Sequence, residues 1–246
     1  MPEKIRLDQL LVDRGLVESR TKAQAVIMAG LVYSGEQKLT SSGAKFDAET
    51  AITLRGQPHP WVSRGGLKLE HGLKHFGFEA KDRICVDVGS STGGFTDVLL
   101  TNGAAKVYAV DVGYGQLAHK LRVDPRVVVM ERTNARTLDA AQIPDPVGAV
   151  VCDASFIGLR TVLPAAMGLA APGAWMIALI KPQFEVGKDR VGKKGVVREP
   201  ELHAEVCETI SNWLAAQPGW SVMGIEKSPI TGPEGNVEFL IGARFT

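Results

Sequence analysis

From residue 65 onward the chain alternates short apolar runs with segments in which apolar residues recur every three or four positions. The runs have the length and β-branched content of buried strands, and the periodic segments predict helices. We expect strands at Ile84 to Val88, Val107 to Asp111, Val127 to Glu131, Val147 to Asp153, Trp175 to Lys181, Ser221 to Ser228 and Val237 to Phe245. We expect helices at Gly66 to Phe76, Thr96 to Asn102, Gly115 to Leu121 and Glu201 to Ala216. This order predicts the α/β fold class, with a doubly wound, Rossmann-like sheet.

The last predicted strand has a pattern of its own. Apolar side chains alternate along it from Val237 to Phe245, with Glu238 and Arg244 among the residues of the opposite face. Clean alternation is typical of an antiparallel strand, and the turn-rich sequence Gly-Pro-Glu-Gly precedes it. We therefore expect the last strand to run antiparallel to the others.

The first quarter of the chain predicts two helices followed by strands. Leu7, Leu10 and Leu11 repeat at helical spacing. Ser19 is a typical N-cap for a second helix, whose apolar face is Ala23, Val26 and Ile27 and which ends near Gly30. A strand at 31–36 that turns at Gly35 and a short strand at 51–54 follow.

A connector separates this segment from the rest. Pro58 and Pro60 hold the backbone extended, and Trp61 can dock against either neighbour, so the connector is expected to be semi-rigid. The prediction is a small α+β domain at residues 1–60 and a larger domain at residues 61–246.

One uncharged stretch, from Thr161 to Ile180, could be mistaken for a membrane span. The Pro172-Gly173 pair is expected to divide it into an alanine-rich helix and a short strand, both too short to cross a bilayer about 30 Å thick. No signal peptide is evident in Met-Pro-Glu-Lys-Ile-Arg. We expect no membrane partner.

Composition narrows the class of protein further. The 246 residues are 45% hydrophobic and carry a formal net charge of +1, so an RNA partner would have to be met by a local basic patch. Cys85, Cys152 and Cys207 lie far apart and form no Cys-x-x-Cys motif. This spacing indicates small buried residues of a protein in a reducing, cytoplasmic compartment, and not a disulfide framework or a metal site.

A glycine-rich loop follows the first strand of the larger domain. Gly89, Gly93 and Gly94 lack Cβ atoms, so the backbone can turn sharply and approach a ligand closely. Asp111 ends the next strand, about twenty residues on, where a βαβ unit places an acid on a ribose diol. A tight turn without ligand is the alternative.

With Asp87 two residues before its first glycine, the loop resembles the first motif of S-adenosylmethionine (SAM) methyltransferases. The resemblance implies SAM as the cofactor and, with Asp111 on the ribose and Asn134 on the adenine, a binding site formed by Asp87, Gly89, Ser90, Ser91, Thr92, Gly93, Gly94, Phe95, Asp111 and Asn134. For Asn134 an ordinary polar turn residue is the commoner explanation.

Charged residues end two further strands. Asp153 and Lys181 are the last residues of theirs, and Glu238 lies near the start of the antiparallel strand, at the same edge of the sheet. Lys68, in the helix ahead of the first strand, could reach over the same pocket. Ligands of such sheets bind beyond the carboxyl ends of the strands, so these residues are catalytic candidates. A salt-bridge cluster at a sheet edge is the alternative.

These four residues resemble the Lys-Asp-Lys-Glu tetrad of the FtsJ/RrmJ-like ribose 2′-O-methyltransferases. The resemblance implies Lys181 as general base, Asp153 as the carboxylate that orients it, and Lys68 with Glu238 as hydrogen-bond partners that fix Lys181 and the 2′-hydroxyl. A 2′-hydroxyl is a poor nucleophile near neutral pH, so the reaction needs such a base, and it requires no metal.

The first quarter of the chain resembles the S4 RNA-binding domain. Arg6-Leu7-Asp8, Ser19-Arg20-x-x-Ala23 and Gly30-x-Val32 carry this resemblance. It implies that cations lie on RNA phosphates: Arg6, Arg14, Arg20 and Lys22, to which we add Arg64 of the larger domain. Without the resemblance, an ordinary solvated helix face is the simpler interpretation.

Both resemblances together identify the whole chain as similar to the TlyA family, some members of which carry the historical label haemolysin. Members of the family methylate 2′-hydroxyls of ribosomal RNA, so the implied partner is ribosomal RNA or a ribosomal subunit. The alternatives are a methyltransferase for protein or small molecules, a SAM-binding RNA-binding factor without turnover, and a membrane-lytic protein. The last would need an amphipathic or spanning segment, and none is evident.

Two further features remain open. The segment from Lys181 to Arg198 predicts a long loop without helix or strand, in which cations outnumber acids. An RNA-facing flap and a merely mobile loop are both compatible with it. His71 and His75 share a helix face, but no third metal ligand is predicted near them.

Overall fold

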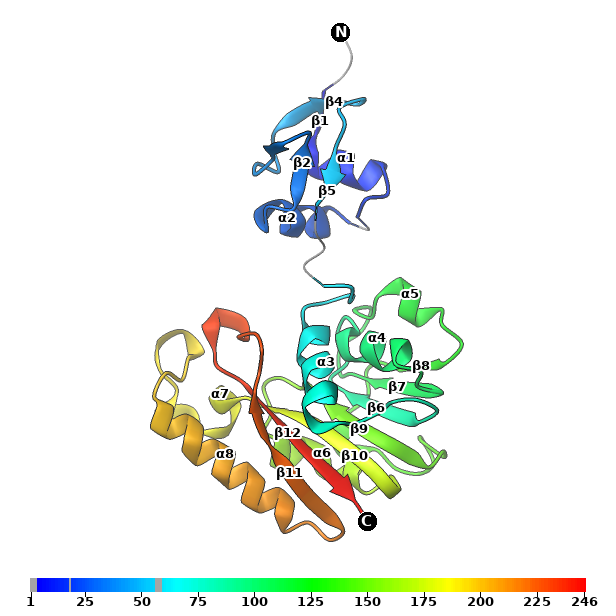
Figure 1. Ribbon diagram of the computed structural model, residues 1–246, viewed down its shortest axis with the longest axis vertical. Coiled ribbons are helices and arrows are strands. Elements are labelled where there is room, and N and C mark those ends of the chain that lie inside the picture. Colours follow the sequence, from blue (N-terminus) through cyan, green and yellow to red (C-terminus); the bar gives the residue numbers. More distant parts are fainter. Residues whose placement is uncertain (1–3, 18, 56–58) are drawn as a thin grey trace. The chain divides into compact units, whose positions relative to one another are not determined.

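The computed structural model describes residues 4–17, 19–55 and 59–246, and its chain divides into two compact units, Met1–Pro60 and Trp61–Thr246 (Figure 1). Pro58 of the predicted connector lies outside the described residues. Within the described residues no helix is both long enough and apolar enough to span a membrane.

The larger unit is built on a seven-stranded sheet in the order β11-β12-β10-β9-β6-β7-β8. Five neighbouring strands, β10, β9, β6, β7 and β8, pair in parallel. Strand β12 is antiparallel to both β10 and β11. Their bounds are β6 Ile84–Val88, β7 Lys106–Val110, β8 Val127–Met130, β9 Val147–Cys152, β10 Ala170–Ile180, β11 Trp220–Lys227 and β12 Phe239–Phe245. The predicted fold class, with its antiparallel last strand, is confirmed.

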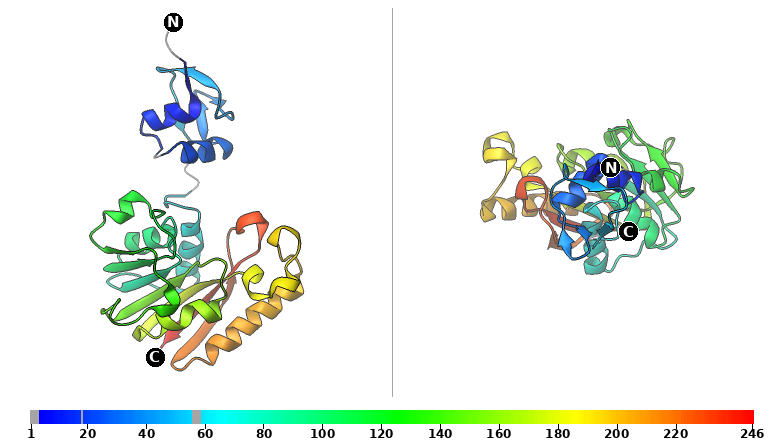
Figure 2. Two further views of the ribbon diagram at one scale, coloured as in Figure 1. Left: turned by 180° about the vertical axis from the view of Figure 1, so that it is seen from behind. Right: turned by 90° about the horizontal axis from the view of Figure 1, so that it is seen from above.

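Helices cover both faces of this sheet (Figures 1 and 2). On one face pack α3 (Gly65–Phe76), α4 (Gly94–Thr101) and α5 (His119–Arg122), which share a hydrophobic core with Ile177 of β10. On the other face pack α6 (Leu159–Met167) and α8 (Pro200–Ala215), which share a core with Met176. Since successive residues of a strand point to opposite faces, the uncharged Trp175–Ile180 segment buries both of its sides.

Three expectations about these elements are wrong in detail. The helix expected at 115–121 is only the four-residue α5, because Gly115 takes a φ of 71° and its N–H binds Glu131 rather than a helical carbonyl. Strand β10 begins at Ala170, ahead of the Pro172-Gly173 pair. The register of its pairing with β9 shifts between Ala170 and Trp175, so the Pro172-Gly173 pair does not end the strand. The segment after Lys181 is not a bare loop, since it forms α7 (Pro182–Glu185) and two 3₁₀ turns, η2 (Lys188–Arg190) and η3 (Lys193–Gly195).

The smaller unit contains the two predicted helices, α1 (Leu7–Asp13) and α2 (Arg20–Met28), and the Ser19 side chain caps α2 by accepting from the Lys22 N–H. Strand β2 (Val32–Ser34) pairs with β3 (Gln37–Lys38) and β5 (Thr53–Leu54). A second pair, β1 (Lys4–Arg6) with β4 (Lys45–Asp47), was not expected from the sequence. The predicted apolar stripes of both helices meet in its core.

Candidate functional site

The order of strands in the sheet reverses at β6, because β7 and β8 lie on one side of it and β9 and β10 on the other. The candidate site lies at this point. In open α/β sheets, helices on opposite faces leave a crevice at this point, beyond the carboxyl ends of the strands. The glycine-rich loop follows β6, Asp111 follows β7, Asp153 follows β9 and Lys181 follows β10. The topology therefore gathers all four sequence-predicted segments at one edge.

The first glycine of the loop is required by its backbone and by its neighbour. Gly89 has a φ of 80°, and a Cβ atom there would lie 2.8 Å from the Cα of Ala154. At Gly93, a Cβ would lie 2.3 Å from Leu121, so the space next to this glycine is filled by protein. The loop glycines thus serve close packing within the protein as well as approach to a ligand.

Asp87 lies beneath this loop and is fully buried. The Thr96 hydroxyl donates to Asp87 Oδ2 at 2.7 Å, while Oδ1 has no partner among the described residues. Burial raises the pKa of Asp87 to about 7. The hydrogen bond from Thr96 acts in the opposite direction, and the negative charge of Asp153 raises the pKa further. A cationic ligand near the loop would favour the charged form.

The raised pKa of Asp87 predicts how stability without ligand depends on pH. Since the folded-state pKa is above the unfolded value, ionisation costs folded-state stability as pH rises from about 4 to about 7. Asp87→Asn stays neutral, so it should melt higher than the parent chain at pH 8, by roughly 5 °C, and show little advantage at pH 4. Thermal unfolding at both pH values tests this, and an equal difference at both would contradict it.

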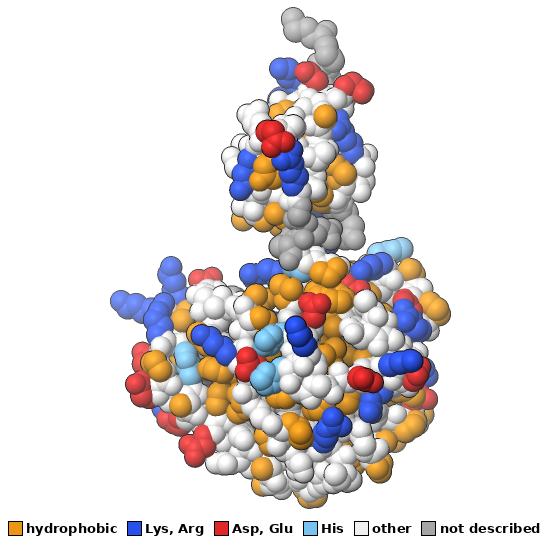
Figure 3. All heavy atoms as spheres, viewed as in Figure 1, with side chains coloured by type: hydrophobic (Ala, Val, Ile, Leu, Met, Phe, Trp, Pro, Cys, Tyr) orange, Lys and Arg blue, Asp and Glu red, His pale blue; other side chains and the backbone are white. Residues whose placement is uncertain are grey.

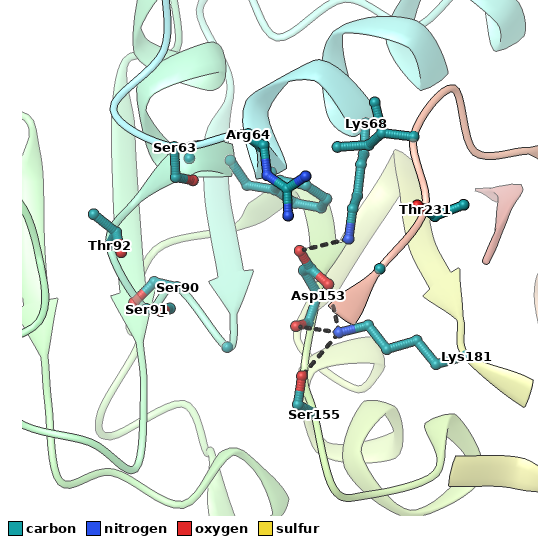
Figure 4. A pocket seen from close by; sticks show the side chains of 16 residues that line it. Ser63, Arg64, Lys68, Ser90, Ser91, Thr92, Asp153, Ser155, Lys181 and Thr231 are labelled. Atoms are coloured by element: carbon teal, nitrogen blue, oxygen red, sulfur yellow. Dashed lines mark hydrogen bonds and ion pairs between the residues drawn. The ribbon is translucent and has the colours of Figure 1, made fainter. Parts of the chain in front are cut away.

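Lys181 is buried among oxygen atoms at the end of β10. Its Nζ lies 2.6 Å from Asp153 Oδ1 and donates to the Asp153 carbonyl and the Ser155 hydroxyl, each at 3.0 Å (Figure 4). Only 7% of the side chain is exposed. The contact of Asp153 with Lys181 expected from the sequence is therefore present.

Lys68 reaches the same carboxylate from α3. Its Nζ lies 3.6 Å from Asp153 Oδ2 and donates to Glu238 Oε2 at 2.6 Å. Glu238 lies directly before β12 and is buried, so Lys68 bridges two carboxylates. The four residues form one chain of contacts in the order Lys181, Asp153, Lys68, Glu238, in which Lys68 meets Asp153 rather than Lys181.

Two cavities of about 390 Å³ each open at this edge, and they share Gly89, Ser91, Asp153 and Ser155. The first exposes Lys68 and Lys181 and is also lined by Ser63, Arg64, Gly65, Ser90, Thr92, Gly94, Phe95, Ile230, Thr231 and Gly232 (Figure 4). The second contains Asp111 and Asn134, together with apolar side chains such as Val112 and Ile157. Of the predicted loop residues, only Asp87 and Gly93 line neither cavity.

Asp111 holds the loop that lies above it. Its carboxylate accepts from the Ser91 N–H at 2.8 Å and from the Gly113 N–H at 2.6 Å. Asn134 caps a short turn, η1 (Ala135–Thr137), by accepting from the Arg136 N–H, so it has the local role that a polar turn residue would have, and it also lines the cavity. Both residues could bind an adenosine placed in the second cavity.

Asp111→Ala is expected to weaken SAM binding by about 10- to 100-fold, because the substitution removes two loop hydrogen bonds together with the carboxylate that is predicted to accept from the ribose. Calorimetry measures this directly. Asp139→Ala, which removes an exposed loop-capping carboxylate remote from the cavities, is the matched control and should bind SAM as the parent does. Unchanged affinity of the Asp111 variant would exclude Asp111 from the site.

The cations predicted to bind RNA in the smaller unit have internal partners. Arg6 and Arg20 both contact the buried Asp8, at 2.9 and 3.1 Å, and hydrogen bonds from Arg6 hold the pKa of Asp8 well below its ordinary range despite its burial. Arg14 donates to the carbonyls of Ala48 and Thr50. These arginines are therefore held in defined orientations, and their role in phosphate binding stays a prediction.

Several residues of the site were missed in the sequence. Ser155 contacts Lys181, and Thr231 lies in the turn before β12 that closes the first cavity. Phe156, at the rim of the second cavity, is 91% exposed and has a φ of 65°, which a bulky residue rarely adopts. Ser155 and Phe156 lie two and three residues after Asp153, and this position beyond the end of β9 was the available signal for them.

The segment after Lys181 is tied to the rest of the unit rather than free. Val196 and Val197 are buried, and Asn236 accepts from the Val197 N–H. Arg190 forms a two-pronged ion pair with Glu205 of α8. These contacts anchor the segment at Arg190 and at Val197, and the RNA-facing flap stays a prediction.

His71 and His75 do have an acidic neighbour, contrary to the sequence-based expectation. Glu226 of β11 lies 3.3 Å from His71 Nε2 and 3.7 Å from His75 Nδ1. The three cysteines are free, as expected, and burial raises the pKa values of Cys85 and Cys152 to about 12. Such thiols are poor nucleophiles and poor metal ligands.

The sheet is doubly wound, and its antiparallel strand β12 lies next to the edge strand β11. Together with the glycine-rich loop after β6 and the charged side chains at the strand ends, this arrangement defines a Rossmann-like methyltransferase. Residues 61–245 match the model of the FtsJ-like methyltransferase family, and residues 5–52 match the S4 domain. The chain therefore belongs to the FtsJ-like methyltransferase family and carries an S4 domain at its N-terminal end.

Relatives and solved structures agree with this assignment. The chain is 54% identical to YqxC of Bacillus subtilis, a candidate rRNA methyltransferase, over 97% of this chain and 85% of YqxC. It is 47% identical to the 16S/23S rRNA (cytidine-2′-O)-methyltransferase TlyA of Mycobacterium tuberculosis, over 99% of this chain and 91% of that protein. A solved structure of a candidate hemolysin from Streptococcus thermophilus matches with a TM-score of 0.78 and 44% identity, over 100% of this chain and 90% of that one.

Proposed function

We propose that this protein transfers a methyl group from SAM to a ribose 2′-hydroxyl of ribosomal RNA, with Lys181 as the general base. The observation that carries the proposal is the buried amine of Lys181, which lines a cavity beside the glycine-rich loop and touches Asp153. The name of the relative from Mycobacterium tuberculosis, a 16S/23S rRNA (cytidine-2′-O)-methyltransferase, supports the same substrate class.

The residues present fit SAM. The second cavity offers the Asp111 carboxylate for a ribose diol and apolar walls for a purine, and the unpartnered Asp87 Oδ1 lies buried beneath the loop, where a cationic ligand would stabilise its charge. When bound, SAM supplies an electrophilic methyl carbon on a positively charged sulfur. Gly89 and Asp153 are two of the four residues that line both cavities, so a SAM in the second cavity would place that carbon next to the first cavity, where Lys181 lies.

Each residue of the cluster has a distinct part in this proposal. Lys181 Nζ would take the proton of the 2′-hydroxyl as its O–H bond breaks, and a bound SAM would supply the methyl group that the oxygen accepts and would leave as the neutral thioether. Asp153 holds the amine in place and stabilises the ammonium that forms. Lys68 and Glu238 fix Asp153 from the other side, so that the base does not rotate out of line.

The smaller unit is proposed to hold the RNA, as the S4 match suggests. The affinity for RNA should then fall steeply with salt, because phosphate contacts release counterions. Lys22→Ala and Arg64→Ala should each lower the slope of log affinity against log salt by about 1. Lys81→Ala, at the opposite end of β6 from the cavities, is the matched control and should keep the slope. Equal slopes for all of the variants and the parent would remove Lys22 and Arg64 from the RNA interface.

The proposed activity is tested by incubating the protein with SAM labelled in its methyl group and with ribosomal RNA or ribosomal subunits. We expect label in the RNA that depends on the protein. A chain that binds labelled SAM and RNA but transfers nothing would instead be an RNA-binding factor that holds SAM without turnover.

A further inference from the structure

Three oxygen atoms lie within 3.0 Å of Lys181 Nζ, and one of them belongs to a residue without an assigned role. Two are the side-chain and backbone oxygens of Asp153, and the third is the Ser155 hydroxyl at 3.0 Å (Figure 4). An ammonium group has three N–H bonds. Lys181 Nζ donates hydrogen bonds to the Asp153 carbonyl and the Ser155 hydroxyl, whereas its contact with Asp153 Oδ1 is an ion pair, since Oδ1 has no hydrogen-bond partner among the described residues.

A general base has to lose one of its three N–H protons and keep the other two. The Asp153 carbonyl and the Ser155 hydroxyl can accept these two, in the ammonium and in the neutral amine alike. The lone pair then lies on the remaining side of the nitrogen, where it is free to take the proton of the 2′-hydroxyl.

We propose that Ser155 is the positioning residue of the general base. Its hydroxyl accepts from Lys181 Nζ in both protonation states, so that the lone pair of the neutral amine stays on the side of the nitrogen that Ser155 does not occupy. Ser155 lines both cavities, so it holds the amine where the proposed cofactor and substrate spaces meet. The inference rests on the proposed role of Lys181 and deepens it.

Other charged groups near Lys181 stay the same when Ser155 is changed. Asp153 follows β9, Lys68 of α3 lies on Asp153, and Glu238 ahead of β12 lies on Lys68. Asp87, at the end of β6, adds a buried carboxyl, and Arg64 lines the same cavity. A change in the pH profile between parent and Ser155 variants therefore reports on the hydroxyl.

The test is the single-turnover rate of methyl transfer against pH, with SAM and RNA saturating, for the parent, Ser155→Ala and Ser155→Thr. Ser155→Ala should lower the plateau rate by about 10- to 100-fold, because the base is no longer held in line. It should also move the inflection to lower pH, because the charged ammonium loses a stronger hydrogen bond than the neutral amine does. Ser155→Thr keeps the hydroxyl and should restore both.

Ser221→Ala, which removes an exposed hydroxyl on β11, is the control and should behave as the parent does. A Ser155→Ala enzyme with the parent's plateau, or with an inflection that is unmoved or higher, overturns the proposal, because lost packing alone slows the reaction without touching the proton. If Ser155→Ala does not fold, Ser155→Cys keeps the size, replaces the hydroxyl by a weak partner and must show the same two changes. Should Lys181→Ala stay active, the base assignment fails; should it be inactive while Ser155→Ala is normal, only the present inference fails.

A separate observation concerns the histidines of α3. His71 and His75 occupy successive turns of the helix, and the ligand atoms of both and of Glu226 on β11 lie within 4.8 Å of one another. Pale-blue histidine side chains lie beside a red carboxylate on the face shown in Figure 3. All three side chains are about a third or more exposed, so an ion could enter from solvent.

The geometry points to a binding site for a divalent transition-metal ion of the zinc type. Two imidazoles and one carboxylate are a common zinc ligand set, with water in the fourth position. Bonds of about 2.0–2.2 Å in a tetrahedral site place ligand atoms roughly 3.4 Å apart, and His71 Nε2 already lies 3.3 Å from Glu226. A bound ion would join α3, which carries Lys68, to β11.

Calorimetry with a zinc salt on the full chain tests this site. We expect one ion per chain at micromolar affinity, weakened by about tenfold or more in His71→Ala and His75→Ala. His119→Ala, an exposed histidine of α5, is the control and should bind zinc as the parent does. Zinc should also raise the melting temperature of the parent but not of the two variants. Equal zinc affinity in parent and variants, or no binding by the parent, would overturn the site.

Discussion

Lys181→Ala is expected to abolish methyl transfer while SAM and RNA affinities stay close to those of the parent. A proton acceptor acts mainly in the transition state, so its removal lowers kcat and leaves ground-state binding in place. Losing a general base costs about 10²- to 10⁴-fold in rate. Single-turnover methylation, with affinities measured separately, tests the separation between chemistry and binding.

Lys181→Arg distinguishes a base from a mere positive charge. A guanidinium keeps its proton at any workable pH, so the arginine variant should be as inactive as the alanine variant although its charge is retained. Lys74→Ala, which removes an exposed lysine of α3, is the control and should be fully active. An active Lys181→Arg enzyme would leave Lys181 with an electrostatic part only.

Lys68→Met is expected to destabilise the protein as well as to inactivate it. Glu238 is fully buried and accepts from Lys68 at 2.6 Å, so the substitution leaves a buried carboxylate without its cation. Breaking such a pair by removing one partner costs about 3–5 kcal/mol of the free energy of unfolding. Urea denaturation of the parent and the variant measures this loss.

The double variant Lys68→Met/Glu238→Gln provides the matched comparison. Removing both charges removes the unpaired ion, so most of the lost stability should return. Activity should not return, because Asp153 still lacks its second cation. A double variant as unstable as Lys68→Met would show that packing, rather than the ion pair, accounts for the loss, and an active one would exclude Lys68 from the mechanism.

The sequence predicted the sheet well because its signals are local and strong. Buried parallel strands are continuous apolar runs, and the residues that end them, Asp153 and Lys181, are charged where the run stops. Parallel strands share one carboxyl edge, so their chain positions alone placed these residues together. The alternating pattern after Val237 likewise indicated the antiparallel strand.

Contacts that depend on tertiary packing were beyond the sequence. The pairing of Glu226 with His71 joins residues 155 positions apart, and no local pattern predicts it. The contacts of Arg6 and Arg20 with the buried Asp8 depend on how α1 packs against α2, and no local pattern predicts them, although both arginine side chains stay about half exposed. In the segment after Lys181, isolated valines at 196 and 197 gave no periodic signal, although their burial ties the segment down.

The central claim is that the methyl group goes to a ribose oxygen, and the position of the label within the nucleoside tests it most directly. RNA methylated by the protein with deuterated SAM is digested to nucleosides and fragmented by mass spectrometry at the glycosidic bond. The account predicts that the deuterated methyl group stays with the ribose fragment, and that Lys181→Ala yields no labelled nucleoside. Label in the base fragment, or in protein instead of RNA, would contradict it.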